Sequence, residues 1–282
     1  MQESAARTKE EDMIGAIIGD IAGSRFEFNN IKTKDFELFV PGLCEPTDDS
    51  IMTLAVAKAI VVYRKVFEEM RYTDFLGDLT VQSMQELGRR YPDSGYGVRF
   101  GRWLYSDDPQ PYNSWGNGAA MRVSPCGWAA NSVEEAAALS RAVTAVTHNH
   151  PEGLKGAEAV ATSIMLLRQG KTKSQIESYI NDKYYRIDFT LDEIRPGFPF
   201  DESCQGTVPQ AFEAFFEAEN FEDTIRNAIS LGGDSDTIAA IAGSVAEACW
   251  DVPEDIRNAA MGYLDDDLKN ILTEFEEAMV VD

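Results

Sequence analysis

Apolar residues recur with helical spacing along most of the chain. In the segment 51–70, for example, Leu54, Ala55, Ala59 and Val62 fall on one stripe, which predicts a long amphipathic helix. Similar patterns predict further helices at 133–146, 151–169, 174–184, 208–217, 221–229, 238–250 and 265–279. Helices far outnumber strand candidates, so we expect an all-α protein.

Local signals support several of these helices. Ser132 and Glu135 form a capping-box pattern, Pro151 suits a first helical turn, and Gly170 suits a helix end. An apolar run at 13–18 continues into the small residues of 19–24. This composition predicts a closely packed helix that runs into a turn.

Two segments lack the helical pattern. Residues 35–40 alternate between polar and apolar, as in a short strand or an extended loop. Residues 91–128 are rich in Gly, Pro, Asn and aromatic residues, and long irregular segments in compact domains are often functional. No linker or repeat divides the chain. We therefore expect one compact multi-helix domain over 13–282, preceded by a flexible tail at 1–12.

Composition narrows the functional classes. Forty-eight acidic and 25 basic residues give a net charge of −23, which argues against a broad nucleic-acid surface. We expect a cytoplasmic protein, because no signal core or membrane span is present, and a monomer rather than an oligomer. With two histidines in one tripeptide and no CxxC pair, a Cys/His zinc site is not expected. Reduced thiols are the simplest interpretation of the cysteines, which are Cys44, Cys126, Cys204 and Cys249.

Two short acidic clusters precede predicted helices. The first spans Thr47–Ser50 and the second Gly232–Thr237, and each offers two carboxylates and at least one hydroxyl. Helix capping explains one such side chain, because Asp, Ser and Thr are favoured at helix N-termini. Adjacent carboxylates also repel one another unless a cation lies between them. Mg²⁺ prefers oxygen ligands, so a shared metal site is the second explanation, and the residues alone leave both open.

Five motifs together resemble the ADP-ribosylglycohydrolase family, over roughly residues 13–250. In order, they are GDIAGSRFE at 19–27, TDDS at 47–50, WGNGAAMR at 115–122, THNHPEG at 147–153 and GGDSDT at 232–237. The resemblance implies an all-α fold with a cleft that holds two Mg²⁺ ions, or Mn²⁺. It implies these metal ligands: Thr47, Asp48, Asp49, Asp234, Asp236 and Thr237. Asp236 is the expected bridging ligand. Ser50 stands where relatives commonly have threonine.

The resemblance also implies catalytic roles. Glu27, at the end of its motif, is expected to act as a general base or a gate, and Asp48 and Asp236 are expected to take part in catalysis. An exposed, inert carboxylate is the alternative for Glu27. Asp20 is expected to be structural or to support the ligands, and Asp93 is a weaker candidate for the base.

A substrate site is implied by two further motifs. The loop Gly116, Asn117, Gly118, Ala119, Ala120 and Met121 is expected to bind a diphosphate, since glycines let backbone N–H groups converge on an anion. His148 is expected near the bound ADP-ribose. Alternatively, His148 and His150 both order the loop before Pro151. Candidates for stacking on adenine are Tyr96, Phe100, Trp103 and Trp115.

We therefore expect a metal-dependent hydrolase that cleaves the glycosidic bond at C1″ of ADP-ribose conjugates. The conjugate is either protein-linked or a small ADP-riboside, and the sequence does not indicate which linkage is cut. A Mg²⁺-dependent phosphatase or pyrophosphatase is one alternative. A non-catalytic ADP-ribose-binding protein of the same fold is another.

Overall fold

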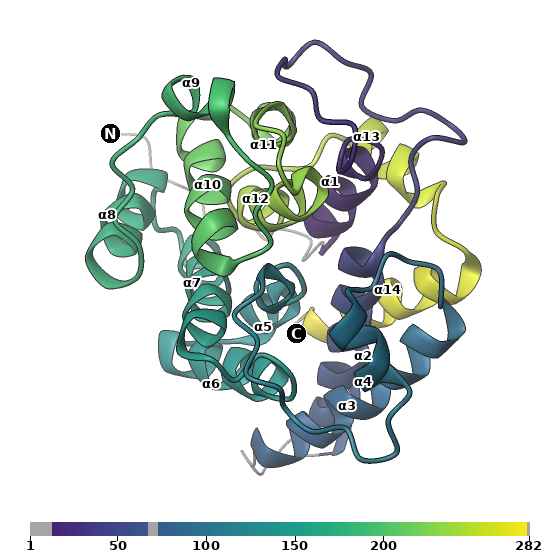
Figure 1. Ribbon diagram of the computed structural model, residues 1–282. Coiled ribbons are helices and arrows are strands. Elements are labelled where there is room, and N and C mark those ends of the chain that lie inside the picture. The colour runs from purple at the N-terminus through teal and green to yellow at the C-terminus, as the bar shows by residue number, and fades with distance from the viewer. Residues whose placement is uncertain (1–12, 67–72, 281–282) are drawn as a thin grey trace.

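Helices make up the regular structure. The computed structural model describes residues 13–66 and 73–280, and no strand occurs among them (Figure 1). The predicted all-α class is confirmed, and the described residues form a single compact domain. The predicted tail at 1–12 lies outside the described residues. The helices are α1 (Gly15–Ser24), α2 (Asp48–Val66), α3 (Thr73–Arg90), α4 (Val98–Leu104), η1 (Asn117–Ala119), α5 (Ser124–Ala129), α6 (Val133–Ala145), α7 (Pro151–Arg168), α8 (Lys173–Lys183), α9 (Leu191–Ile194), η2 (Arg195–Gly197), α10 (Cys204–Glu217), α11 (Phe221–Ser230), α12 (Ser235–Cys249), α13 (Glu254–Met261) and α14 (Asp266–Met279).

The backbones of α1 and α12 touch. A Cβ atom added at Gly19 would lie 2.1 Å from the carbonyl oxygen of Ala239. At Gly15 it would lie 2.4 Å from the carbonyl oxygen of Gly243, and at Gly23 it would lie 2.5 Å from the Cα of Asp236. Glycines at every fourth position therefore give α1 a face without side chains, as the small residues of its sequence predict.

A buried carboxylate from α12 caps α1. Glu247 is 3% exposed and accepts hydrogen bonds from the backbone N–H groups of Ile14, at 2.8 Å, and Gly15, at 2.9 Å. The first N–H groups of a helix have no partner inside the helix, and its dipole favours negative charge there. The pair α1–α12 is thus joined by both packing and charge.

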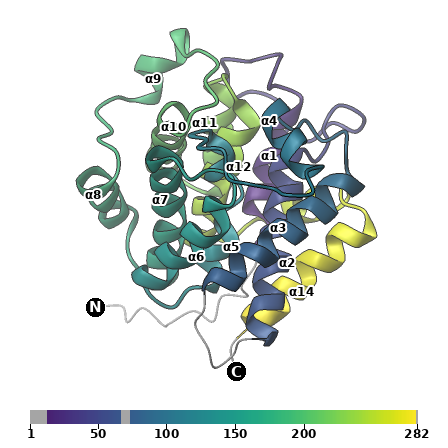
Figure 2. The same ribbon diagram turned by 60° about the horizontal axis from the view of Figure 1, so that its bottom comes forward.

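The other long helices surround this pair in two groups. Figure 2 shows α2, α3 and α14 side by side, and α2 contacts both of the others. On the other side, α7, α10 and α11 pack against α12, and α5 and α6 pack against α7. None of the described helices is both long and apolar enough to cross a bilayer.

Several predicted boundaries need correction. Helix α2 begins at Asp48 rather than Ile51, and the predicted end at 67–70 lies outside the described residues. Helix α10 begins at Cys204, where Ser203 caps it by accepting from the N–H of Gly206. The sequence placed this start too late because Pro209, a residue that disfavours helix interiors, follows the first turn.

Helix α3 was not predicted. Its buried positions include Leu76, Thr80, Ser83, Met84 and Leu87, so polar residues interrupt the apolar stripe. Helices α4 and α5 were also missed, because each is short and lies in the irregular region 91–128.

The segment 35–40 forms an extended loop, not a strand. Its apolar side chains nevertheless pack inward, with the ring centroids of Phe36 and Phe26 5.3 Å apart. Among the described residues, no neighbouring segment offers it a ladder of backbone hydrogen bonds. The apolar side chains of this segment therefore contribute to the core without strand pairing.

The local helix signals are largely confirmed. Gly170 ends α7 with φ at 86°. Ser132 accepts from the N–H of Glu135, but the Glu135 carboxylate accepts from the N–H of Asn131 rather than from that of Ser132. The second hydrogen bond of the predicted capping box is therefore made one residue earlier, by the N–H of Asn131.

Gly19→Ala should destabilise the protein. A Gly-to-Ala change in a helix normally stabilises it, but here the new methyl group meets the α12 backbone. We expect the free energy of unfolding to fall by about 2–3 kcal/mol. The matched control is Gly101→Ala in α4, where nothing lies within 4 Å of the added atom. Chemical denaturation measures both variants, and equal stabilities for the two would contradict the contact.

Glu213→Gln should stabilise the protein at high pH. Burial, followed by the nearby Glu217, raises the pKa of Glu213 to about 7 from 4.5. The folded chain therefore holds this proton more tightly, and stability falls as pH rises from about 4.5 through 7. We expect Glu213→Gln to raise Tm at pH 8 and to lose this advantage towards pH 4.5. The control is Glu274→Gln on an exposed face of α14, and the same pH profile in both variants would contradict the assignment.

Candidate active site

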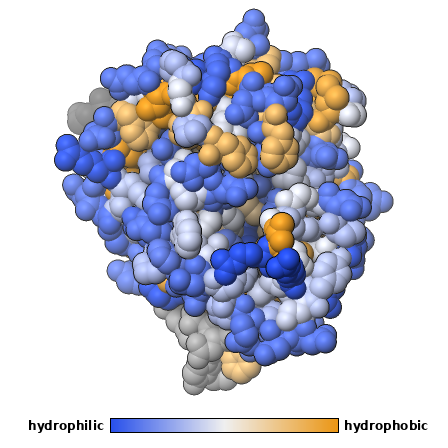
Figure 3. Space-filling view, viewed as in Figure 1, coloured by the Kyte–Doolittle hydropathy of each residue, from blue (hydrophilic) through white to orange (hydrophobic). Residues whose placement is uncertain are grey.

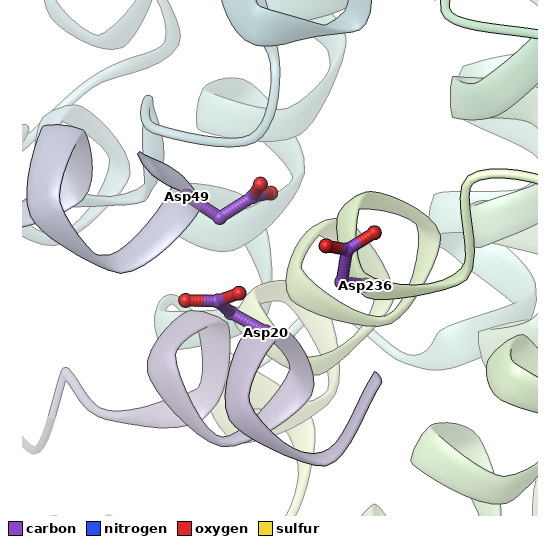
Figure 4. Close-up of side chains that lie close together, drawn as sticks. All are labelled: Asp20, Asp49 and Asp236. Atoms are coloured by element: carbon purple, nitrogen blue, oxygen red, sulfur yellow. The ribbon is translucent and has the colours of Figure 1, made fainter. Parts of the chain in front are cut away.

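Three helices bring carboxylates together. Asp20 lies in the middle of α1, Asp49 in the first turn of α2 and Asp236 in the first turn of α12. Figure 4 shows these three carboxylates facing a common space. All three side chains are buried, and one oxygen from each lies within 4.8 Å of the others. The two acidic clusters, which are far apart in sequence, thus form one site.

A second group of carboxylates shares Asp236. Glu27, Asp234 and Asp236 also place oxygens within 4.8 Å of one another. Glu27 is partly exposed, whereas the two aspartates are buried. One residue therefore belongs to two adjacent groups of potential ligands, which is the arrangement expected of a carboxylate shared by two ions.

Asp20 performs the helix capping. Its carboxylate accepts from the N–H of Thr47 at 2.9 Å, from the Thr47 hydroxyl at 2.6 Å and from the N–H of Ser50 at 3.0 Å. It also accepts from the Ser50 hydroxyl. These four donors give Asp20 a structural role, which is one of the two roles that the resemblance implied for it. Asp48 and Asp49 are thereby not needed as caps of α2.

Asp49 has an unused carboxylate oxygen. Its Oδ2 accepts from the hydroxyl of Thr237 at 3.3 Å, while Oδ1 is buried without a hydrogen-bond partner among the described residues. A buried, unpaired carboxylate oxygen is costly in a folded protein. An ion in this space would satisfy it.

Two glycines shape the turn before α12. Gly232 and Gly233 have φ values of 67° and 70°, which other residues rarely adopt. Asn30 fixes this turn, because its side chain accepts from the N–H of Gly233 at 2.8 Å and donates to the Gly233 carbonyl at 2.9 Å. The same amide donates to the Glu27 carbonyl at 2.9 Å. Asn30 thus ties the segment of Glu27 to the start of the second acidic cluster.

Burial and mutual repulsion favour protonation of the acids. Burial, followed by neighbouring acids, raises the pKa of Glu27 to about 7 and that of Asp48 to about 8. The same causes raise the pKa of Asp49 and Asp236 well above the usual range. Arg122 opposes the shift at Asp48. A divalent cation would relieve this repulsion, so the donor set and the unpaired oxygen of Asp49 fit a metal centre.

Asp48 stands apart from the two groups of converging oxygens. It is partly buried, and its Oδ1 lies 3.6 Å from the position of a Cβ added at Gly95. Its charge also contributes to a raised pKa of Tyr96. The structure therefore places Asp48 beside the space between the converging carboxylates, facing the segment before α4. Asp93, the weaker candidate for a base, is exposed in that segment.

The loop 116–121 forms η1, and most of its N–H groups are used within the protein. The N–H of Asn117 donates to the carbonyl of Glu202 at 2.7 Å, and that of Ala119 donates to Gly116 at 3.2 Å. The N–H groups of Ala120 and Met121 both donate to the Asn117 carbonyl. A row of open N–H groups, as predicted for a diphosphate loop, is therefore not present. The Asn117 side chain instead donates to Asp234 at 2.6 Å, which links the loop to the acidic cluster.

The two histidines differ in their surroundings. His148 is 5% exposed, and its Nε2 lies 3.5 Å from a Cβ added at Gly116 and 3.3 Å from one added at Gly118. Its ring therefore lies directly against the loop. His150 caps α7 by accepting from the N–H of Glu152 at 3.1 Å. This hydrogen bond gives His150 a structural role at the start of α7, in line with the alternative that the histidines order this region.

Most of the candidate stacking aromatics belong to the core. Phe100 and Trp103 are buried and stack on each other with centroids 5.5 Å apart, and Tyr96 packs against Phe100. Trp115, which is 49% exposed beside the loop, remains accessible to a ligand.

The sequence did not single out an aromatic pair near the acids. Phe28 and Phe200 stack with centroids 6.1 Å apart, and both are exposed. Each is close in sequence to an acid, Phe28 to Glu27 and Phe200 to Glu202, and Glu27 contributes to the second group of carboxylates. In Figure 3, apolar side chains gather in the upper half of an otherwise mostly hydrophilic face, where the α1–α2 and α9–α10 connections lie. In the sequence, the pair could have been found only from two phenylalanines next to acidic residues, Phe28 after Glu27 and Phe200 before Asp201.

Comparisons with known proteins agree with these features. A family model described as ADP-ribosylglycohydrolase matches residues 11–280. ADP-ribosylhydrolase ARH3 of Homo sapiens is 25% identical over 334 residues, covering 91% of this chain and 90% of that protein. ADP-ribosylarginine hydrolase Tri1 of Pseudomonas putida (strain GB-1) is 26% identical over 278 residues, covering 89% of this chain and 72% of that protein.

A solved structure shares the fold. It is described as an ADP-ribosylglycohydrolase-related protein complex, with a TM-score of 0.67 and 20% sequence identity, and the match covers 97% of this chain and 100% of that one. The family model spans nearly the whole chain, in agreement with the five motifs. The chain belongs to the ADP-ribosylglycohydrolase family, whose members are glycosyl hydrolases.

Proposed function

We propose that this protein is a metal-dependent hydrolase that cleaves the glycosidic bond at C1″ of ADP-ribose conjugates and releases ADP-ribose. The observation that carries the proposal is the placement of Asp236 in two adjacent groups of carboxylate oxygens. The unpaired, buried Oδ1 of Asp49 supports it, because the described protein offers this atom no partner. Membership of the family supplies the substrate class.

The proposed cofactor is a pair of Mg²⁺ ions, or Mn²⁺. The proposed ligands are Thr47, Asp49, Asp234, Asp236 and Thr237, with Glu27 at the open side. Asp48 is included as a ligand on the resemblance alone, since its carboxylate lies beside the two groups. The ions would act as Lewis acids on substrate oxygens and help to orient water. Asp20 keeps the first cluster in place by capping α2, and Asn117 restrains Asp234.

The chain supplies a base and a binding surface. In the proposed reaction, a water oxygen bonds to C1″ while the bond from C1″ to the leaving heteroatom breaks. The bonding electron pair departs with the heteroatom, which takes up a proton from solvent, so that the proton that the water loses balances the one that the leaving group gains. Glu27 accepts a proton from the attacking water, which suits its partly exposed position beside Asp234 and Asp236. The loop 116–121 and His148 hold the ADP-ribose.

Activity should depend on the metal and on Asp236. We expect an ADP-ribosylated peptide or a small ADP-riboside to be hydrolysed in the presence of Mg²⁺ or Mn²⁺, with EDTA abolishing turnover. Asp236→Asn should lower kcat/KM at least about 100-fold, because both groups lose a charged ligand. The control is Asp182→Asn on α8, which is exposed and remote from the acidic site. Full turnover by Asp236→Asn would contradict the shared-ligand role.

Product analysis separates the alternatives. The proposal requires free ADP-ribose with an intact diphosphate, measured by chromatography and mass spectrometry. Inorganic phosphate and AMP as the products would identify a phosphatase or pyrophosphatase. Tight ADP-ribose binding without turnover of any conjugate would identify a binding protein.

Asp49→Asn should separate the metal's effect on stability from repulsion between the acids. In EDTA the substitution removes a buried charge with an unpaired oxygen, so we expect a Tm a few degrees above that of the parent protein. Added Mn²⁺ should raise the Tm of the parent and have a much smaller effect on the variant. Differential scanning calorimetry tests this prediction. A variant that is less stable in EDTA and responds fully to Mn²⁺ would indicate that Asp49 is structural.

A further inference from the structure

A fully buried arginine lies behind the ligand loop. Arg122 is 1% exposed, and its guanidinium packs over the ring of Phe100 with 5.4 Å to the centroid. Its Nη2 donates to the hydroxyl of Thr147 at 2.6 Å and lies 3.3 Å from Nδ1 of His148. Burying a guanidinium is costly, and the proposed reaction gives this one no role.

The hydrogen bonds around Arg122 determine where His148 carries its proton. Because Arg122 has donors alone, the oxygen of Thr147 must accept from it. The single hydroxyl proton of Thr147 is then available to Nδ1 of His148, 2.7 Å away. Two donors therefore face Nδ1. This nitrogen must be an acceptor, which leaves the proton of the neutral ring on Nε2.

The opposite side of the ring faces the ligand loop. The side-chain hydrogen bonds of His148 within the described residues all involve Nδ1. Nε2 lies 3.3 Å from a Cβ added at Gly118, so a side chain there would press against the ring. The charged groups that act on the ring are Arg122 and Arg99, and the ring of Tyr112 packs 5.9 Å from it. Burial and these two cations lower the pKa of His148 well below its usual value, so the ring is neutral.

We infer that Arg122 is a positioning residue for ligand binding, which acts through Thr147 and His148. It holds the imidazole in one tautomer, so that Nε2–H is offered to an anionic oxygen of a phosphate group held over the Gly116–Gly118 turn. This donor compensates for the N–H groups of the loop that are already used within the protein. The inference rests on the proposed function for the identity of the ligand as the diphosphate of ADP-ribose.

The tautomer can be measured directly in the free protein. The chain has two histidines, so a long-range ¹H–¹⁵N correlation spectrum contains two imidazole patterns, and His150→Gln assigns them. We expect His148 to show Nε2 protonated and Nδ1 unprotonated, with no titration across the neutral pH range. Protonation of Nδ1, or an even mixture of tautomers, would overturn the inference.

Substitutions test the role of Arg122 in binding. Arg122→Met should allow Nδ1 to carry the proton and should weaken ADP-ribose binding about tenfold, the loss expected for one hydrogen bond to a charged group. If this variant does not fold, Thr147→Val provides the second test. It removes one of the two donors to Nδ1, and we expect a loss of affinity of about threefold. Thr147→Ser keeps the hydroxyl and should restore both the affinity and the spectrum.

Thr144→Val is the matched control. The hydroxyl of Thr144 is buried and has no hydrogen-bond partner in the described part of the chain, so this variant should leave His148 and the affinity unchanged. A folded Arg122→Met or Thr147→Val variant with parental imidazole shifts and parental affinity would show that Arg122 is merely structural.

Failure of the proposed function would look different. In that case the parent protein would bind no ADP-ribose in calorimetry with Mg²⁺ present, whereas the free-state tautomer of His148 would still be as expected. ADP-ribose binding with the opposite tautomer would leave the proposed function intact and overturn the role of Arg122.

Discussion

The direct backbone contact between α1 and α12 is the constraint on which the site depends. No side chain separates the helices at Gly15, Gly19 and Gly23, so their relative position is fixed to within the size of a methyl group. The last of these glycines touches the backbone of Asp236 itself. Asp20, on the same helix, caps α2 and thereby places Asp49 opposite Asp236. One close contact therefore positions both acidic clusters.

Helix N-termini make the buried negative charge tolerable. Glu247 satisfies the first N–H groups of α1, and Asp20 satisfies those of α2. Each of these carboxylates belongs to a neighbouring helix: Glu247 lies on α12 and caps α1, and Asp20 lies on α1 and caps α2. The charge interactions therefore join the same helices that pack together. Asp236 lies in the first turn of α12, where the helix dipole also favours an acid. Asp49, with one oxygen unpaired, is left as the residue whose charge needs an external partner.

The sequence predicted the fold class and the acidic clusters because both are local patterns. Helical periodicity is visible in the longer helices with an apolar buried stripe, and it was missed in α3, where Thr80 and Ser83 are buried. The capping role of Asp20 depends on a contact between helices that no local pattern reveals. The same is true of the hydrogen bonds from Arg122 and Thr147 to His148. The glycines of the 116–121 loop suggested open N–H groups, but the structure shows that backbone carbonyls accept most of them. Glycines in a sequence show that some group can approach the backbone closely, but they do not show which group; here it is the ring of His148.

Anomalous diffraction from crystals grown with Mn²⁺ tests the central claim most directly. The account predicts two anomalous peaks that share Asp236, one beside Asp49 and the other beside Glu27 and Asp234. A peak next to one group alone would show that Asp236 is not shared between two ions. Saturating Mn²⁺ with no peak at Asp236 would contradict the metal centre altogether, and the converging carboxylates would then be a structural feature of the helix ends.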